Sequence, residues 1–540
     1  FFDIDDFSGG LNTRRIEHQK LSSQLLRAKN LDPGKGAITP RRGAWSYAQS
    51  DISGGGSVPL QGVFRYYPQL STSVGKRFLV ADNDSIYAGV DDITFASSII
   101  SGSYGSALIS SLDNTAGVSF KQWLDNVYIA NGKFASSGLK IFTGTTGLIT
   151  ALTSGTNDPP DKIKRLEVWK DRMFATLAGN KLRYSDVRDA TEWPLDHEIT
   201  VGRDDGQDIT AIKRFQISSD DVLVCFKANA IWQIENLEPS GWLPRPRIIS
   251  PDIGTAAPES VAWTPAGLIF VHYSGVYILG ENGQVREISK RISPTFDAFT
   301  GVGLTHINPK RINQVCGVYS RGLYRMSYPS IDATTNDHEL VVDLEETYDD
   351  GFGEVEPPWF GQREYTFGAA RSYIVLHGDS GEVIAASASS SQLFVMDAGG
   401  FDVDSGARTT GGNQTTIAWE AETIAMPIKP LAQRKDFYSP VVVLSGGIDD
   451  SITLVAIVDK GGAVSSVSKT VEGVIKWDEA DLVWDVTGMT WDGTAPKNHT
   501  FLLSSMQGHS VGFRISGSYS LAQPRVQAIS VPFHRLGIAA

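Results

Sequence analysis

The sequence contains very little cysteine. Cys225 and Cys316 are the only two in 540 residues, which is too few for a disulfide framework, so a fold held together by disulfides is excluded. Both lie in apolar, strand-like segments, VLVCF and NQVCGVY. We therefore expect two buried thiols that behave as small hydrophobic side chains.

Positive charge and long apolar runs are also scarce. The chain has a net charge of −13 and no long basic run, which argues against tight sequence-specific DNA binding, because that requires a basic face. No apolar run approaches the ~18 residues of a membrane-spanning helix. The first ten residues, FFDIDDFSGG, carry three acids and no basic region, so we do not expect them to act as a signal peptide.

Recognisable catalytic and metal-binding patterns are missing too. The nine histidines are dispersed, and none forms an HxH or HxxxH pair of the kind that binds zinc. There is no G-x-S-x-G nucleophile elbow, and Gly34-Lys35-Gly36 lacks the spacing of a phosphate-binding loop. A Ser-His-Asp triad assembled from distant positions stays open, because spacing does not test it. We expect no catalytic residue, no cofactor and no enzyme activity.

The densest acidic segment, DLEETYDDGFGEVE at 343–356, is the strongest candidate for a site. Clustered carboxylates can bind Ca²⁺, and Asp343, Glu345, Asp349 and Asp350 are weak candidates for its ligands. Alternatively, two of them could act as acid and nucleophile on a glycosidic bond. The order of ligands in an EF-hand loop is not met, and the segment follows a strand-like run. A solvated loop between strands is therefore the expected structure.

The sequence does contain abundant glycine, aromatic residues and a repeat. Glycine accounts for 54 residues and aromatics for 10%, a composition typical of β-rich chains with tight turns. Short apolar runs recur roughly every fifty residues, a period typical of propeller blades or solenoid repeats. The runs are FLVAD at Phe78, VYIAN at Val127, MFATL at Met173, VLVCF at Val222, LIFVH at Leu268, LYRMS at Leu323 and YIVLH at Tyr373.

Each apolar run is followed by turn residues and a second β-like run, which predicts a hairpin. One hairpin in about fifty residues leaves room for two further strands, and four-stranded blades that stack radially cover each other's faces. We therefore predict an all-β fold in which residues 61–400 form a β-propeller of six or seven blades. The GH…WD signature does not recur, so a WD-repeat propeller is disfavoured.

The two ends of the chain differ from the repeat. Residues 1–60 read as an N-terminal arm with a short helix at 22–30 (SSQLLRAKN), for which Ser22 or Ser23 is the expected N-cap. Residues 398–414 are rich in glycine and polar residues and read as a linker. From 415 to 540, longer alternating strands between turn signals predict a β-sandwich-like domain.

Several motifs, in order along the chain, resemble one family. They are FSGGLNTRR, NLDPGKGAITPRRG, RLEVWKDRMFAT, LRYSDVRDATEWP, DGQDITAIKRFQ and VLVCFKANAIWQIE. Together they resemble the β-propeller tail proteins of tailed bacteriophages, which include the nozzle (tail tubular) proteins and the packaged-DNA stabilisation, or tail hub, proteins. The resemblance covers roughly residues 5–290, and RVQAISVPFHRLG near the end of the sequence extends it less specifically.

This resemblance implies a structural protein of the virion tail that is assembled in the host cytoplasm. Such proteins form a homo-oligomeric ring, typically a hexamer, beneath the portal and its adaptor. The ring extends the DNA ejection channel, helps to retain the packaged genome, and carries tail fibres or a tail tip. Double-stranded DNA would pass through the lumen without sequence-specific binding.

The family offers no catalytic residue, so the positions that match its pattern are expected to be structural. Gly9, Gly10 and Gly36 would serve turns that need a positive φ, and Trp169 and Trp193 would anchor blade packing. The full set is Gly9, Gly10, Asn12, Asn30, Gly36, Arg42, Gly43, Trp169, Ser185, Asp186 and Trp193.

Two alternatives belong to other classes of protein. The first is a carbohydrate- or receptor-binding module, since exposed Trp faces stack on sugars and the C-terminal region contains Trp419, Trp477, Trp484 and Trp491; core positions are the expected interpretation of these residues. The second is a propeller glycoside hydrolase that acts on host surface glycans. The sialidase-type Asp-box repeat is absent, which makes the hydrolase the weaker alternative.

Overall fold

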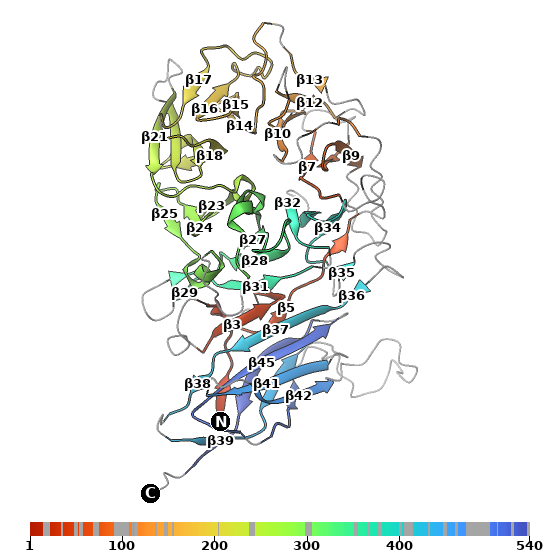
Figure 1. Cartoon of the computed structure of the whole chain (residues 1–540), viewed down its shortest axis with the longest axis vertical. Coiled ribbons are helices and arrows are strands. Elements are labelled where there is room, and N and C mark those ends of the chain that lie inside the picture. The colour runs from red at the N-terminus through yellow and green to blue at the C-terminus, as the bar shows by residue number, and fades with distance from the viewer. Residues whose placement is uncertain are drawn as a thin grey trace, which may run out of the picture.

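In a computed structural model the regular structure of the described residues is almost entirely β-strand (Figure 1). The structure describes residues 1–13, 22–33, 36–47, 52, 58–68, 75–90, 107–110, 112, 117–134, 138–144, 150–153, 156–203, 205–236, 244–296, 305–349, 355–365, 367–375, 381–398, 402–403, 414–429, 433–445, 451–459, 463–470, 497–504, 506–519 and 523–536.

Small antiparallel sheets follow one another in sequence order and form the blades of a β-propeller. The first described unit is β7 (Gly62–Tyr66), β8 (Arg77–Ala81) and β9 (Ile86–Val90). Four four-stranded units follow: β10 (Ser119–Trp123), β11 (Asn126–Ala130), β12 (Lys140–Phe142) and β13 (Thr150–Ala151); β14 (Arg165–Trp169), β15 (Arg172–Thr176), β16 (Lys181–Tyr184) and β17 (Glu198–Thr200); β18 (Ile209–Ile217), β19 (Asp220–Lys227), β20 (Ile231–Asn236) and β21 (Pro244–Ser250); β22 (Ala262–Thr264), β23 (Gly267–His272), β24 (Gly275–Leu279) and β25 (Val285–Glu287).

Two further units complete the ring. One consists of β26 (Cys316–Ser320), β27 (Leu323–Tyr328), β28 (His338–Asp343) and β31 (Trp359–Arg363). The other consists of β32 (Ala370–Val375), β33 (Val383–Ser387) and β34 (Leu393–Val395), and its fourth strand is β6 (Trp45–Ser46) from the N-terminal region. Strand β32 contacts β7, so the last unit lies against the first and the ring is closed (Figure 1).

The predicted repeat corresponds to real strands, with one displacement. Six of the seven apolar runs lie on the second strand of a unit, from β8 to β27. The seventh differs: Tyr373, Ile374 and Val375 of YIVLH lie on the first strand, β32. The second strand of that unit is β33, whose sequence VIAAS is made of smaller side chains. The β14–β15 turn shows how the hairpins close: Lys170 and Asp171 both have positive φ, as a type I′ turn requires.

The predicted helix at 22–30 is wrong. Residues Gln24–Lys29 form strand β3, which pairs in parallel with β31 of the propeller and antiparallel with β37 (Ile417–Thr423) of the C-terminal region. Gly361 in β31 permits this approach, because a Cβ atom there would lie only 1.6 Å from the Ala28 carbonyl oxygen. Two neighbouring strands thus override the local helical propensity.

The C-terminal region contains two packed sheets. One has β37, β45 (Ser510–Tyr519), β41 (Ser451–Val458) and β42 (Ala463–Thr470), and the other has β1 (Phe2–Ile4), β46 (Arg525–Val531), β40 (Val441–Ser445) and β43 (Lys497–Thr500). Side chains of both sheets, such as Leu454, Phe513, Val442 and Ile529, share one buried cluster. Strand β41 alternates buried positions with partly exposed ones, as expected for a sandwich strand.

Strand β3 joins this region to the propeller. One continuous sheet runs in the order β26-β27-β28-β31-β3-β37-β45-β41-β42, with β2 (Gly10–Leu11) beside β3 and β38 (Met426–Pro427) beside β45. Hydrogen-bonded sheets therefore cross the predicted boundaries near residues 60 and 400. The division into an arm at 1–60, a propeller at 61–400 and a C-terminal domain at 415–540 stays a prediction.

Short elements complete the description. They are β4 (Leu31–Asp32), β5 (Thr39–Pro40), β29 (Tyr348–Asp349), β30 (Val355–Glu356), β35 (Asp402–Val403), β36 (Gln414–Thr415), β39 (Lys435–Phe437), β44 (Met506–Gly508), β47 (Phe533–Arg535) and the 3-10 helices η2 (Pro258–Ser260), η3 (Lys290–Thr295) and η4 (Pro309–Gln314). Cys225 and Cys316 are free and buried, as predicted. Among the described residues, no helix has the length and apolar character needed to cross a membrane.

Candidate functional site

The acidic segment at 343–356 is only partly within the described residues. Asp343 ends β28, and its Oδ1 accepts a hydrogen bond from the Glu345 amide at 3.0 Å. Asp349 lies in β29, and Asp350 lies outside the described residues. No group of three or more His, Cys, Asp or Glu side chains that could hold a metal occurs in the part of the chain that was searched, which is the described part. The Ca²⁺ assignment stays an untested prediction.

The glycines of the family pattern differ from one another. Gly10 and Gly36 have φ of +62° and +84°, as predicted. The prediction is wrong for Gly9, whose φ is not positive; a Cβ atom there would meet Ser23 O and the Gln24 side chain at 2.9 Å. Gly9 therefore serves a close approach between strands and not a left-handed turn. Beside it, Asn12 is buried and its Nδ2 donates to Gln24 Oε1 at 3.0 Å.

The pattern residues of the third blade lie in its core and its turn. Trp169 and Trp193 are fully buried, in the clusters that this blade shares with its two neighbours. Ser185 Oγ accepts from the Met173 amide at 3.0 Å and donates to the Asp186 carbonyl oxygen at 2.9 Å. Asp186 Oδ1 accepts a hydrogen bond from the Val187 amide at 3.0 Å, so this carboxylate stabilises the turn in which it lies.

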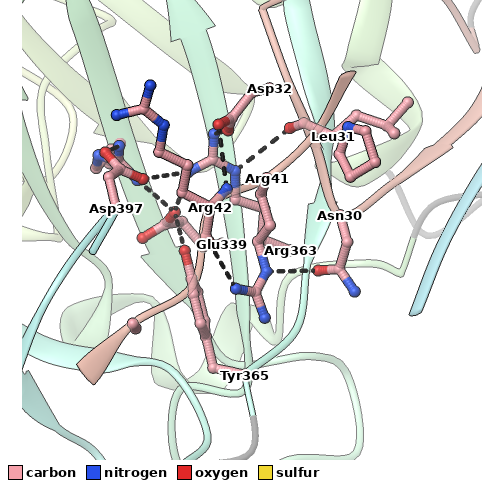
Figure 2. Close-up of polar contacts among 12 residues, drawn as sticks. Asn30, Leu31, Asp32, Arg41, Arg42, Glu339, Arg363, Tyr365 and Asp397 are labelled. Carbon is pink, nitrogen blue, oxygen red and sulfur yellow. Dashed lines mark hydrogen bonds and ion pairs between the residues drawn. The ribbon is translucent and has the colours of Figure 1, made fainter. Parts of the chain in front are cut away.

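The remaining pattern residues lead to a cluster of buried charges where the arm, the propeller and the C-terminal sheet meet (Figure 2). We call it the junction cluster and define it as Asn30, Asp32, Arg41, Arg325, Glu339, Arg363, Tyr365, Tyr373, Asp397 and Asp402. Arg42 and Gly43 border it: the Arg42 amide donates to Asp32 Oδ2 at 3.3 Å, and the Gly43 carbonyl accepts from Ala398 at 2.8 Å.

Asn30 connects all three parts of the molecule. Its Nδ2 donates to the carbonyl of Ala418 in β37 at 2.7 Å. Its Oδ1 accepts from Arg41 Nε at 3.0 Å and from the Glu364 amide, just after β31, at 2.9 Å. Its φ is +53°, a conformation that Asn tolerates better than most residues. This position needs a residue that tolerates a positive φ and whose side chain both donates and accepts hydrogen bonds. Asn meets both requirements.

Arg41 is 1% exposed and uses every donor of its guanidinium. Nη1 and Nη2 bind the two oxygens of Asp402 at 2.9 and 2.6 Å. The remaining Nη hydrogens go to the carbonyls of Arg42 and Glu364 at 2.9 and 2.7 Å. With Nε on Asn30, all five N–H groups are bonded, which is the condition under which a buried guanidinium is tolerated. Its charge also lies 4.1 Å from the centre of the Tyr365 ring.

The other half of the cluster centres on Glu339 of β28, which is fully buried. Its Oε1 lies 3.2 Å from Arg325 Nη1 and 3.3 Å from Arg363 Nη1, and accepts from Tyr365 OH at 2.9 Å. Its Oε2 accepts from Tyr373 OH. Arg363 also binds Asp32 of β4, and Arg325 also binds Asp397.

Burial and charge oppose each other throughout the junction cluster. Burial works to lower the pKa of Arg41, but the hydrogen bonds and charge of Asp402 outweigh it and raise that pKa above its ordinary value. Burial works to raise the pKa of Asp397, but the charges of Arg325 and Arg363 hold it below its ordinary value. The arginines and Asp397 therefore stay ionised in the folded protein, and the cluster binds the chain together by charge-assisted hydrogen bonds.

A smaller chain of charges lies at the edge of the cluster. Glu364 binds Lys29 Nζ at 2.8 Å and lies 3.7 Å from His338 Nε2, while His338 Nδ1 lies 3.0 Å from Asp337. The hydrogen bond from His338 lowers the pKa of Glu364 to about 2. Burial alone would lower the pKa of His338, but Asp337 and Glu364 raise it to about 9. The imidazole is therefore protonated near neutral pH.

The propeller axis contains a separate cavity of about 640 Å³. It is lined by the first strands of several blades, including β7, β10, β14, β18 and β32. Two ion pairs cross it, Lys121 with Glu167 and Arg165 with Glu259. Because each pair joins different blades, they bind the ring together across its axis.

Sequence reasoning identified Asn30 and Arg42 but missed the charges that matter most. A usable signal was present: Arg325, Glu339 and Arg363 stand within apolar strand sequences, LYRMSY, HELVVD and WFGQR. A charged residue at a position that alternation predicts to be buried requires a buried partner. The identity of that partner depends on the folded chain, since Glu339 and Arg363 are 24 residues apart and Asp32 and Arg363 are 331 apart.

No model of a known protein family matches the chain, and no curated protein matches it. Solved structures similar to it include BBS1N in complex with ARL6DN (12% identity, 67% of this chain and 97% of that chain, TM-score 0.38), the mitotic checkpoint complex (12%, 64% and 96%, 0.36) and the WD40 β-propeller domain of Doa1 (8%, 65% and 96%, 0.36). At these identities and scores the matches assign neither a family nor a function, and the fold rests on the strand pairing described above.

Proposed function

We propose that the chain is a structural protein of the tail of a tailed bacteriophage, a nozzle or hub subunit that assembles into a homo-oligomeric ring, typically a hexamer, beneath the portal and its adaptor. In the virion it would extend the DNA ejection channel and bind tail fibres or a tail tip. Double-stranded DNA would pass through the ring without sequence-specific contacts, and the subunit would have no enzyme activity.

One observation carries this proposal, together with the family resemblance of the sequence motifs. A single hydrogen-bonded sheet runs from the sixth propeller unit through the arm strand β3 into the C-terminal sheet, and the junction cluster binds the same three parts with buried charges. A subunit that must transmit force between neighbours needs such a connection, because a flexible linker would let the two parts move independently.

A second observation supports contacts with other proteins. Five exposed, large apolar side chains lie at one end of the propeller, at or next to the connections between first and second or third and fourth strands. Trp263 is 63% exposed and Leu195 is 83% exposed; the others are Tyr67, Leu124 and Val187. Aromatic and aliphatic side chains that are exposed in the isolated chain are typical of protein interfaces.

The test is the mass of the purified protein, measured by native mass spectrometry over a range of concentrations. We expect a closed six-fold or twelve-fold species. The double variant Leu195→Glu/Trp263→Glu should shift it toward the monomer if this end of the propeller takes part. Ile248→Glu, at a 44% exposed position on the outer strand β21, is the matched control and should leave the mass unchanged.

The alternatives give different results. A monomer at every concentration that also cleaves a host surface polysaccharide would contradict the proposal and favour the hydrolase. A monomer that binds a glycan array without cleavage would favour the binding module. Trp419 is not available for sugar stacking, because it is 2% exposed. Trp477, Trp484 and Trp491 lie outside the described residues.

A further inference from the structure

A second cavity, of about 560 Å³, lies at the other end of the propeller from the exposed apolar side chains. It is formed where the last two units meet the first, by η4, by the residues before β7, and by connections between second and third strands. We call it the rim pocket and define it by its lining: Pro59, Leu60, Gln61, Asn83, Asn308, Lys310, Arg311, Asn313, Gln314, Thr335, Arg371 and Ala388.

The rim pocket is cationic in an acidic protein. Its described lining has three positive side chains, Lys310, Arg311 and Arg371, and no carboxylate, whereas the whole chain has a net charge of −13. None of the three forms a salt bridge with any described residue. Arg371 Nη1 donates to the Gln314 carbonyl oxygen at 3.3 Å, which orients the guanidinium without neutralising it.

Two acids near Arg371 and Asn83 already have partners within the fold. Burial works to raise the pKa of Glu259, but Arg165, Lys213 and Arg371 together lower it, so one carboxylate faces three cations. Its direct ion pair is with Arg165, in the axial cavity. Next to Asn83, Asp82 Oδ1 accepts the Ser85 amide at 2.8 Å and thereby holds its own turn. Glu259 therefore offsets only part of the charge of Arg371, and Lys310 and Arg311 have no salt-bridge partner among the described residues.

We propose that the rim pocket binds a small polyanion, a molecule with two or more phosphate or carboxylate groups. The volume is within the range of small-molecule sites. Lys310 and Arg311 lie in η4 and Arg371 lies in β32, so cationic groups on two separate elements could bind two oxyanion groups of one ligand. Amide side chains of Gln61, Asn83 and Asn313 add neutral hydrogen-bonding groups around them. A cleft with one sign of charge also concentrates counter-ions from solution.

Isothermal titration calorimetry of the full chain at low salt tests the proposal, with tripolyphosphate as the phosphate probe and citrate as the carboxylate probe. The probe that binds more tightly identifies the group the pocket prefers. Lys310→Gln and Arg311→Gln should each weaken binding about five- to tenfold, the loss expected for one charge-assisted contact. Lys181→Gln, which removes the same charge from an exposed strand outside the pocket, should leave binding unchanged.

Substitutions of opposite charge at position 83 test whether binding depends on the charge of the pocket. A loss of structure would weaken binding in both variants, whereas an electrostatic effect would weaken it in one and strengthen it in the other. Asn83 is exposed at the pocket edge. Asn83→Asp adds a negative charge and should weaken binding about tenfold, whereas Asn83→Lys should strengthen it several-fold. The proposal is overturned if the wild-type chain binds neither probe at millimolar concentration. It is also overturned if Lys181→Gln weakens binding as much as Lys310→Gln does, since binding would then be non-specific.

Discussion

Arginine has opposite surroundings in two regions of the molecule. In the junction cluster, Arg41 is 1% exposed and bonded through all five donors, and Arg363 lies among carboxylates. In the rim pocket, Arg311 and Arg371 line a cavity whose described lining contains no acid. The comparison separates two uses of one side chain: a charge with its partners in the same chain contributes to the fold, and a charge without them is available to a ligand.

The largest expected effect comes from removing one partner of a buried pair. Arg41→Ala would leave Asp402 buried without its counter-charge and should lower the free energy of unfolding by about 3–5 kcal/mol. Urea denaturation followed by tryptophan fluorescence measures it. Arg42→Ala is the matched control, since that side chain is exposed, and should change stability by less than about 0.5 kcal/mol. If the two variants lowered the free energy of unfolding equally, the buried ion pair of Arg41 would contribute no more to stability than an exposed charge does.

Asn30 tests whether the junction depends on hydrogen bonds as well as on charge. Asn30→Ala removes three side-chain bonds and puts a less tolerant residue at a φ of +53°, so it should cost about 2–3 kcal/mol. Asn30→Asp keeps the acceptor for Arg41 and loses only the donor to Ala418, and should cost about half as much. The same denaturation assay compares them, and a smaller loss for Ala than for Asp would refute this assignment.

The edge of the junction cluster should give the protein a pH dependence. His338 has its pKa raised to about 9, so its contribution is fully present below about pH 6.5 and is lost as pH rises through 9. We expect about 3 kcal/mol of stability to disappear between those values. The variant His338→Gln should flatten this part of the profile, which thermal melts at pH 6, 7.5 and 9 would reveal. An unchanged slope would show that another group is responsible.

The smallest effect on stability is expected for variants in the rim pocket. These variants best distinguish charges that bind a ligand from charges that stabilise the fold. Lys310→Gln and Arg311→Gln should change the free energy of unfolding by less than about 0.5 kcal/mol, because neither side chain has a salt bridge to lose among the described residues. Arg41→Lys, in contrast, should weaken the fold and leave tripolyphosphate binding unchanged in the fraction that folds. Paired measurements of stability and binding on these variants separate the two roles.

The sequence predicted most of the propeller and little of the junction. Period and turn chemistry are local properties, so VLVCF and its hairpin partner could be placed on strands β19 and β20 without knowledge of the rest of the chain. The region 22–30 was misassigned because its strand is defined by two distant partners, at 362 and at 420–423. The family pattern identified Asn30 as structural, but its partners Ala418 and Glu364 are set by the tertiary structure.

The strand that completes the last blade has a consequence for the synthesis of the protein. Trp45 in β6 pairs with Val395 in β34, about 350 residues further along the chain. At ribosomal speeds of roughly 5–20 residues per second, about 20–70 s pass between the synthesis of β6 and the synthesis of its partner strand β34. The earlier blades can stack on one another during this time, but the ring stays open, with an unpaired strand at its start. Closure is therefore a late event, and the N-terminal segment is most exposed to wrong pairing with other nascent chains while it waits.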